Sequence, residues 1–171
     1  MTDPATKTSK HTLTLLTTVY DALKLSAQQQ GIEPNELIQN IIIDHVIEAK
    51  TLDAVTQEHI LTGRRLIAAA VEVAKQRCRD GLFAATITLD TFRACCADPK
   101  WIADYEAYVG DNPYKNGNPL KGINREIGFG IRRAIGGEVV KADGKPVSVK
   151  VLSEVIQSYT PMAGFDPKAV A

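Results

Sequence analysis

The sequence has few cysteines, no long apolar run and no net charge, and each absence narrows the class of protein. Its 171 residues include three cysteines, Cys78, Cys95 and Cys96. An odd number with one adjacent pair does not make a disulfide framework, so we expect a reducing, cytoplasmic setting. There is no charged-then-apolar leader and no apolar run of bilayer-spanning length. We therefore expect neither export nor membrane insertion.

The net charge is zero, from 20 basic and 20 acidic residues, so no global basic field indicates a nucleic-acid partner. The charge is unevenly distributed, however. Residues 111–150 hold eight basic and four acidic side chains, a net of +4, whereas residues 1–50 hold four basic and six acidic ones, a net of −2. Because DNA binding depends on local charge, this composition still allows it, with the positive charge in the C-terminal third.

Motifs for catalysis or cofactor binding are also absent. The sequence has no G-x-S-x-G elbow, no H-E-x-x-H pair and no paired carboxylates at a marked loop. Cys95 and Cys96 lack the spacing from each other, and from His45 or His59, that zinc ligands show. The glycines of residues 122–130 do not form a phosphate-binding loop after a strand. We therefore expect no enzyme, no metal and no cofactor.

The most informative stretch is Lys10 to Ala49. It opens with alternating polar and apolar residues, with Leu13 and Leu15 apolar, which is typical of a strand. Helical spacing follows, and Gly31 is placed to end a first helix. Pro34 is placed to begin a second one, in the first turn where its missing N–H is not needed. A strand and two helices cannot bury a core alone, so this stretch predicts a partner.

This stretch resembles a ribbon-helix-helix domain of the Arc and MetJ type, over about the first third of the chain. The matching positions are Leu13 and Leu15, Tyr20 and Leu23, Ala27-x-x-x-Gly31-Ile32, and Glu36-Leu37-Ile38. In that family two chains pair their ribbons into an antiparallel sheet that enters the DNA major groove. The resemblance implies that Lys10, Thr12 and Thr14 read bases. It also implies that Glu33, Pro34 and Asn35 bring the start of the second helix to a DNA phosphate.

The chemistry of these residues is compatible with that role. Lysine can bond to guanine, threonine can bond to a base or contact a thymine methyl, and a helix N-terminus offers N–H groups to phosphate. The alternative is an ordinary helical hairpin whose leading Thr-Leu-Thr-Leu is a loop or helix cap. Residues 1–9 lack an apolar period, and we expect a disordered arm there.

The middle region, residues 50–110, is expected to be helical apart from one short stretch. Its apolar spacing predicts a long helix from Ala54 to about Arg79, then shorter helices over Thr91–Cys96 and Trp101–Val109. The apolar run Ala85–Leu89 is interpreted as a strand. Three aromatic residues at helical spacing are expected in the core rather than stacked on bases: Trp101, Tyr105 and Tyr108.

A cluster of turn residues, Gly110 to Pro119, marks the clearest boundary of the sequence. After it we expect a helix over Pro119–Ile135 and a hairpin of Glu138–Lys141 with Pro146–Val149. A basic helix followed by a hairpin resembles the recognition helix and wing of a winged-helix domain; the alternative is a small α+β region with a solvated basic face. The candidates for a second DNA contact are Lys121, Arg125, Arg132, Arg133, Lys141 and Lys145.

The sequence therefore predicts a mainly α protein with small β elements. Its expected parts are a disordered arm (1–9), a ribbon-helix-helix domain (10–49), a helical region (50–110), a basic α+β region (111–160) and a tail (161–171). The expected function is sequence-specific binding of double-stranded DNA as a homodimer or higher oligomer, acting as a transcriptional repressor. Two alternatives remain open: an accessory protein for plasmid or phage DNA transfer, partition or packaging, and an assembly module that binds only protein.

Overall fold

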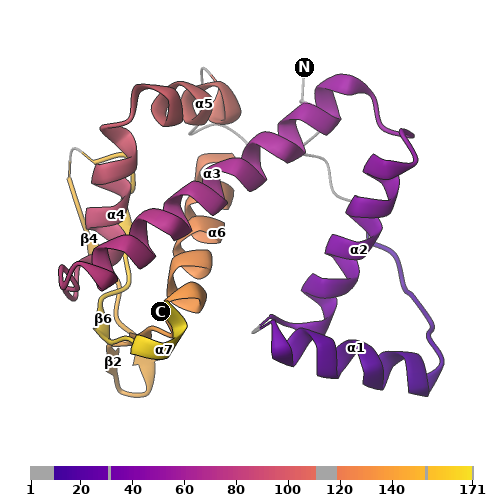
Figure 1. The fold of residues 1–171 in the computed structure, drawn as a ribbon, viewed down its shortest axis with the longest axis horizontal. Helices are drawn as coiled ribbons and strands as arrows, with labels where there is room; N and C mark the ends of the chain where they lie inside the picture. Colours follow the sequence, from indigo (N-terminus) through magenta and orange to yellow (C-terminus); the bar gives the residue numbers. More distant parts are fainter. Residues whose placement is uncertain (1–9, 31, 111–118, 153, 171) are drawn as a thin grey trace. The chain divides into compact units, whose positions relative to one another are not determined.

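The computed structural model describes residues 10–30, 32–110, 119–152 and 154–170, with no side-chain placement for residues 119–121 (Figure 1). The chain is mainly helical, with small antiparallel strand pairs towards its C-terminus. It divides into two compact units, a first unit of Met1–Ile60 and a second unit of Leu61–Ala171. The predicted arm of residues 1–9 and the turn-rich residues 111–118 lie outside the described residues.

The first unit contains two helices that pack against each other, α1 (Thr17–Gln29) and α2 (Pro34–Glu48). Proline occupies the first position of α2, as the sequence predicted, because its missing N–H is not needed there. Both helices begin without a side-chain cap, at Leu16 and Glu33. Of the described hydrophobic residues of this unit, only Ala27 and Leu37 are buried. The hairpin therefore has very little core of its own.

Residues 10–16, where we expected a ribbon strand, form neither helix nor strand in the single chain. Leu13 is 60% exposed and Leu16 is 74% exposed, whereas Leu15 is partly buried. In a ribbon-helix-helix fold this strand pairs only with the same strand of a second copy, so one chain leaves it without a partner. The ribbon remains a prediction.

Helix α3 (Ala54–Arg79) matches the predicted long helix at both ends. The Asp53 carboxylate accepts a hydrogen bond from the Thr56 amide at 2.9 Å, and hydrogen bonding to Thr56 lowers the pKa of Asp53. Two arginines in the last turn suit the negative end of the helix dipole. Along the part in the second unit, buried side chains recur every four residues: Leu66, Ala70, Ala74 and Cys78.

Two shorter helices follow, α4 (Ile87–Cys96) and α5 (Pro99–Val109). The strand predicted over Ala85–Leu89 is wrong, because most of this apolar run forms the first turn of α4. A short apolar run fits a buried strand and a buried helix equally well, and only packing decides between them. Asp98 caps α5, accepting from the amides of Lys100 at 2.9 Å and Trp101 at 3.4 Å.

Helix α6 (Pro119–Ala134) matches the predicted basic helix, and its buried isoleucines lie four residues apart. It ends where Gly136 adopts a φ of 57°, and the Gly137 amide donates to the Arg132 carbonyl at 2.8 Å. Gly130 allows a close approach to α3, because a Cβ atom there would lie 3.1 Å from Ile67 Cγ2. This packing fixes which face of α6 remains exposed.

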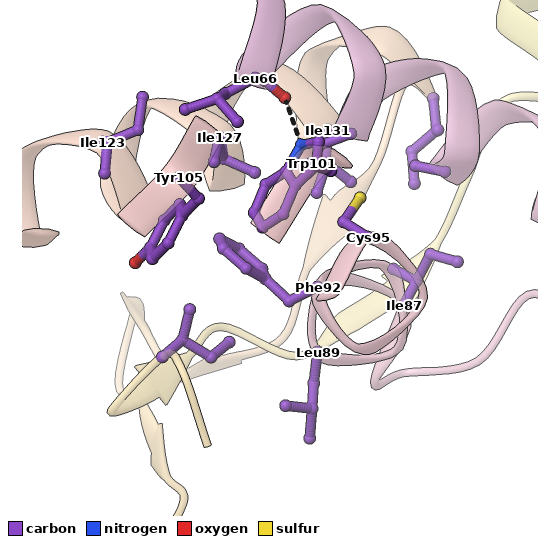
Figure 2. Packing of buried hydrophobic residues seen from close by; sticks show 14 of the residues in the cluster. Leu66, Ile87, Leu89, Phe92, Cys95, Trp101, Tyr105, Ile123, Ile127 and Ile131 are labelled. Carbon is purple, nitrogen blue, oxygen red and sulfur yellow. Dashed lines mark hydrogen bonds between the residues drawn. The ribbon is translucent and has the colours of Figure 1, made fainter. Parts of the chain in front are cut away.

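Aromatic side chains organise the centre of the second unit (Figure 2). The Trp101 indole stacks on Tyr105 with ring centres 5.1 Å apart and meets Phe92 edge-on at 6.3 Å. Its N–H donates to the Leu66 carbonyl at 3.3 Å. Trp101 and Tyr105 are almost fully buried, so these two residues lie in the core, as the sequence predicted.

The strands form three antiparallel pairs of two or three residues each. The hairpin of β2 (Lys141–Ala142) and β3 (Lys145–Pro146) turns at Asp143 and Gly144, which both have positive φ, as a tight hairpin turn requires. Further pairs join β4 (Val149–Lys150) to β5 (Ser158–Tyr159) and β1 (Glu138–Val139) to β6 (Met162–Gly164).

These pairings correct two predictions. Glu138 and Val139 do not belong to the hairpin, since β1 pairs with β6 instead. Residues 161–171 were predicted to be a loose tail, but β6 and the short helix α7 (Pro167–Val170) continue the fold there. Val170 is buried, and the Phe165 ring lies 4.9 Å from the Phe83 ring. Apolar contacts distant in sequence hold this segment, and no local pattern predicts them.

The predicted boundary at residues 110–119 does not separate two compact units. The helices on either side of it, α5 and α6, both belong to the second unit and contribute to one hydrophobic core. The division falls instead between Ile60 and Leu61, inside α3. A cluster of turn residues therefore marks a connection within the second unit, and the basic region shares its core with the helical region before it.

Candidate functional site

The exposed side of α6 is the most distinctive surface of the second unit. Burial of Ile123, Ile127 and Ile131 turns the opposite face of the helix outward. Arg125, Phe129 and Arg132 lie on this face, at spacings of four and three residues. We call these three residues the arginine–phenylalanine face.

The two guanidinium groups are held by one aromatic ring. The Arg125 Cζ atom lies 5.1 Å from the centre of the Phe129 ring, and the Arg132 Cζ atom lies 5.4 Å from it. Both distances are within the range of cation–π attraction. Phe129 remains 37% exposed, so the three side chains form a surface cluster and not part of the core. The arrangement therefore gathers two positive charges around one ring.

A hollow of about 230 Å³ opens beside this face. Its apolar lining comes from four separate segments of the chain. These are Phe92 on α4, Val139 on β1, Met162 on β6, and Ile156, which precedes β5. Arg125, Phe129 and Arg132 line it from α6. The polar groups that complete the lining come from Thr88, Asn124, Ser148, Ser158, Tyr159 and Thr160.

Asn124 is oriented by a neighbour in the core. The Tyr105 hydroxyl donates to the Asn124 Oδ1 atom at 2.8 Å. The amide nitrogen of Asn124, which has two donors, takes no part in this bond. The contact with a core residue restrains the Asn124 side chain beside the hollow.

The described lining of the hollow contains no carboxylate. Within the described part of the chain, neither Arg125 nor Arg132 forms an ion pair, although Arg93 pairs with Glu154 at 2.6 Å elsewhere in this unit. The charged groups that line the hollow, among the described residues, are therefore positive. Such a site is chemically suited to an anion.

The predicted base-reading residues lie in the first unit. Lys10, Thr12 and Thr14 are all exposed, in the segment that precedes α1. Exposure leaves their side chains accessible, but the single chain does not form the paired ribbon that would present them together. Their role stays a prediction.

The predicted phosphate contact lies at the start of α2. Glu33 is the residue before the helix and has extended backbone angles, φ −74° and ψ 145°, and its side chain makes no capping hydrogen bond. Pro34 is half-buried, and Asn35 is exposed in the first helical turn. First-turn N–H groups are suited to phosphate, whereas the Glu33 carboxylate is not.

The remaining predicted DNA contacts are scattered. Arg133 is half-buried and already engaged in an interaction within the chain. Lys141 and Lys145 are exposed on the β2–β3 hairpin and do not line the hollow. The side chain of Lys121 lies outside the described residues. Of the five candidates whose side chains the structure describes, Arg125 and Arg132 are the two that share the hollow.

The described residues offer little support for metal binding, for a reactive thiolate or for a membrane-spanning helix. No three His, Cys, Asp or Glu side chains among them converge as metal ligands. Burial raises the pKa of Cys95 to about 12 and also raises the pKa of Cys78 and Cys96, which disfavours reactive thiolates. None of the described helices has both the length and the apolar character needed to cross a bilayer.

The sequence predictions missed Phe129 and most of the hollow. The spacing of Arg125, Phe129 and Arg132 was a visible signal, since residues three and four apart share a helix face. Ser148, Ser158 and Thr160 gave no such signal, because chain folding brings them to α6 from distant positions.

Comparison with known proteins supplies no further assignment: no family model, curated protein or solved structure matches this chain.

Proposed function

We propose that this protein binds double-stranded DNA in a sequence-specific manner, as a homodimer or higher oligomer, and acts as a transcriptional repressor. The observation that carries the proposal is the first unit. It has two packed helices, an exposed segment of alternating residues before them and almost no core. A ribbon-helix-helix dimer would give this segment a pairing partner and cover the exposed apolar side chains.

In this proposal Lys10, Thr12 and Thr14 read base edges in the major groove, and the first turn of α2 contacts a phosphate. A second contact is made by Arg125 and Arg132, with Lys141 and Lys145 on the hairpin in the position of a wing. The second unit supplies the basic surface that the first unit lacks. Phosphate contacts position the protein, and base contacts give specificity.

The test is a DNA-binding titration of the wild type and the variant Lys10→Ala/Thr12→Ala/Thr14→Ala. The specific duplex is first selected by the wild type from a random pool, and binding is compared with random duplex at two salt concentrations. We expect the variant to lose the preference and to keep weak, salt-sensitive binding. Loss of two to three base contacts weakens specific binding by about 1–3 kcal/mol per contact.

The matched control is Lys24→Ala/Thr17→Ala/Thr18→Ala, which makes the same three changes at exposed positions of α1. It should retain the preference for the selected duplex. If the wild type selects no sequence from the pool, or if both variants bind like the wild type, then the ribbon does not read DNA.

A function of another class is favoured by one observation. Leu13, Leu16, Leu25, Ile41 and Ile42 expose large apolar side chains, and such a surface also suits an assembly module that binds only protein. Salt separates the two functions. Phosphate neutralisation makes affinity fall steeply with salt, whereas an apolar protein interface is far less sensitive.

A further inference from the structure

The hollow beside α6 has the features of a small-molecule site, although its two arginines are also the side chains of the proposed second DNA contact. Its apolar part is formed by Phe92, Val139, Ile156 and Met162, from four separate segments of the chain. Its polar part is concentrated on α6 and β5, around Arg125, Arg132 and Asn124. An apolar lining with a few convergent polar groups is the usual composition of a ligand pocket.

The size of the hollow limits what it can hold. A volume of about 230 Å³ lies just below the range of about 300–1,000 Å³ that is usual for small-molecule pockets. This accommodates one flat ring with its substituents, either as a free molecule or at the end of a strand, and not an internal segment of a polymer. The apolar residues give a ring a surface to pack against, while the hydroxyls of Ser148, Ser158 and Thr160 are able to bond to polar atoms on its edge.

The charge at the hollow indicates an anion with more than one negative charge. Two guanidinium groups line it, no described lining residue is acidic, and the Asn124 amide adds donors. A single carboxylate is satisfied by one bidentate arginine. A phosphomonoester carries about −1.5 to −2 charges at neutral pH and three strong acceptor oxygens, which better matches two arginines.

Phe129 explains how the arginines are prepared for such a ligand. Both guanidinium groups lie against its ring, so their side chains are restrained before a ligand arrives. Restraint of this kind lowers the entropy that binding must overcome. Phe129 is therefore a positioning residue that acts through Arg125 and Arg132.

We propose that this hollow binds a compact phosphomonoester that carries a flat ring, with the ring against Phe92, Ile156 and Met162 and the phosphate at Arg125 and Arg132. Two sources offer this chemistry: a free nucleoside monophosphate, and the phosphorylated 5′ end of a DNA strand. The site does not depend on sequence-specific duplex binding by the first unit, so either proposal can fail without the other.

The experiment is calorimetric titration of the full chain with thymidine 5′-monophosphate, thymidine and inorganic phosphate at one ionic strength. We expect the monophosphate to bind at least about tenfold more tightly than either fragment, because only it uses both parts of the site. The proposal is overturned if thymidine binds as tightly as its monophosphate, if inorganic phosphate does so, or if no probe saturates at millimolar concentration.

Variants locate the binding. Arg125→Gln/Arg132→Gln should weaken monophosphate binding by about a hundredfold while the melting temperature stays unchanged, because both arginines are exposed. The matched control Lys100→Gln/Lys168→Gln removes the same charge from exposed sites of the second unit that do not line the hollow, and it should bind normally. Equal losses in both variants would mean general charge attraction and would overturn the site.

Two further arms complete the test. Phe129→Leu keeps an apolar side chain but removes the ring. It should weaken binding of the monophosphate while leaving thymidine binding unchanged, and equal losses for both ligands would contradict the positioning role.

Oligothymidylate that carries a 5′ phosphate or a 5′ hydroxyl distinguishes the two sources of the ligand. A preference for the phosphorylated oligonucleotide assigns the site to DNA ends, whereas equal binding of the two oligonucleotides assigns it to the free nucleotide.

Discussion

The two compact units of this protein differ most in how much hydrophobic core each has. Eighteen buried residues, from Leu66 to Val170, form one cluster in the second unit. In the described part of the first unit only Ala27 and Leu37 are buried among the hydrophobic residues. A well-packed domain of about 60 residues buries about 60% of the surface that its unfolded chain exposes and is only marginally stable. From this difference we expect the second unit to be stable by itself and the first unit to gain stability from a partner, such as the second copy in the proposed dimer.

The comparison also separates two kinds of surface. In the first unit the exposed groups of interest are apolar, with Ile41 and Ile42 both about half exposed on α2. In the second unit they are cationic and lie beside a hollow. An apolar surface suits association with another protein chain, and a cationic hollow suits an anionic ligand.

The largest effect is expected in the core of the second unit. Ile131 on α6 is fully buried in the cluster around Trp101 (Figure 2), so Ile131→Ala leaves a cavity and should cost about 2–5 kcal/mol. Chemical denaturation followed by Trp101 fluorescence measures the change. Because this core lies within one chain, the cost should not depend on protein concentration. A concentration-dependent midpoint would contradict an independent second unit.

The next effect concerns association through the first unit. Ile42→Asp places a charge on the exposed apolar side of α2 and should weaken dimerisation by about 2 kcal/mol, or roughly thirtyfold in the dissociation constant. Analytical ultracentrifugation over a range of concentrations measures it. Gln39→Asp is the matched control, an exposed position on the same helix with the same new charge. If the wild type is monomeric throughout, the first unit does not self-associate.

Smaller effects on stability, of opposite sign, are expected from replacing two helical glycines of the second unit with alanine. Gly63 on α3 is buried, and a Cβ atom there would lie 2.9 Å from the Tyr108 ring. We expect Gly63→Ala to destabilise by about 1–2 kcal/mol, since the clash outweighs a gain of roughly 1 kcal/mol in helix propensity. Thermal unfolding measures the balance.

Gly122→Ala supplies the control on α6, because nothing lies within 4 Å of a Cβ atom at that position. It should stabilise by about 0.5–1 kcal/mol through helix propensity alone. Stabilisation by both substitutions would show that Tyr108 moves aside at little cost and that the second unit is packed more loosely than the contacts indicate.

Much of the fold could be predicted from local patterns. The ends of α3, the start of α2 at Pro34 and the buried isoleucines of α6 follow from apolar spacing and helix signals, which act within a few residues. The Asp143–Gly144 turn follows from the need for positive φ. The hydrophobic period of two at residues 12–15 is also local, but a strand forms only with a partner, and one chain does not provide it.

The missed features depend on contacts between distant residues. The segment at 162–164 pairs with residues 138–139, and Ile87 starts a helix where an apolar run suggested a strand. Similarly, the hollow joins Thr88, Phe129 and Thr160 from three separate segments. Two arginines of the candidate site were visible as part of a basic helix. The ring that holds them and the space beside them depend on how the chain folds.

The last effect is absent at neutral pH: an alkaline loss of stability confined to the second unit, which contains all three cysteines. Burial raises the pKa of Cys95 to about 12, whereas an exposed thiol has a pKa of 9.0. Below about pH 9 the thiol is protonated in both states and its contribution is fully present. Between about pH 9 and 12 the unfolded chain loses this proton first, so the unfolding free energy falls, by about 0.4 kcal/mol at pH 9 and about 1.4 kcal/mol at pH 10. Cys95→Ala removes the linkage and should make the variant's unfolding free energy correspondingly less dependent on pH between 8 and 10. Identical pH profiles for wild type and variant would mean that Cys95 is not shielded from solvent in the core that distinguishes the second unit from the first.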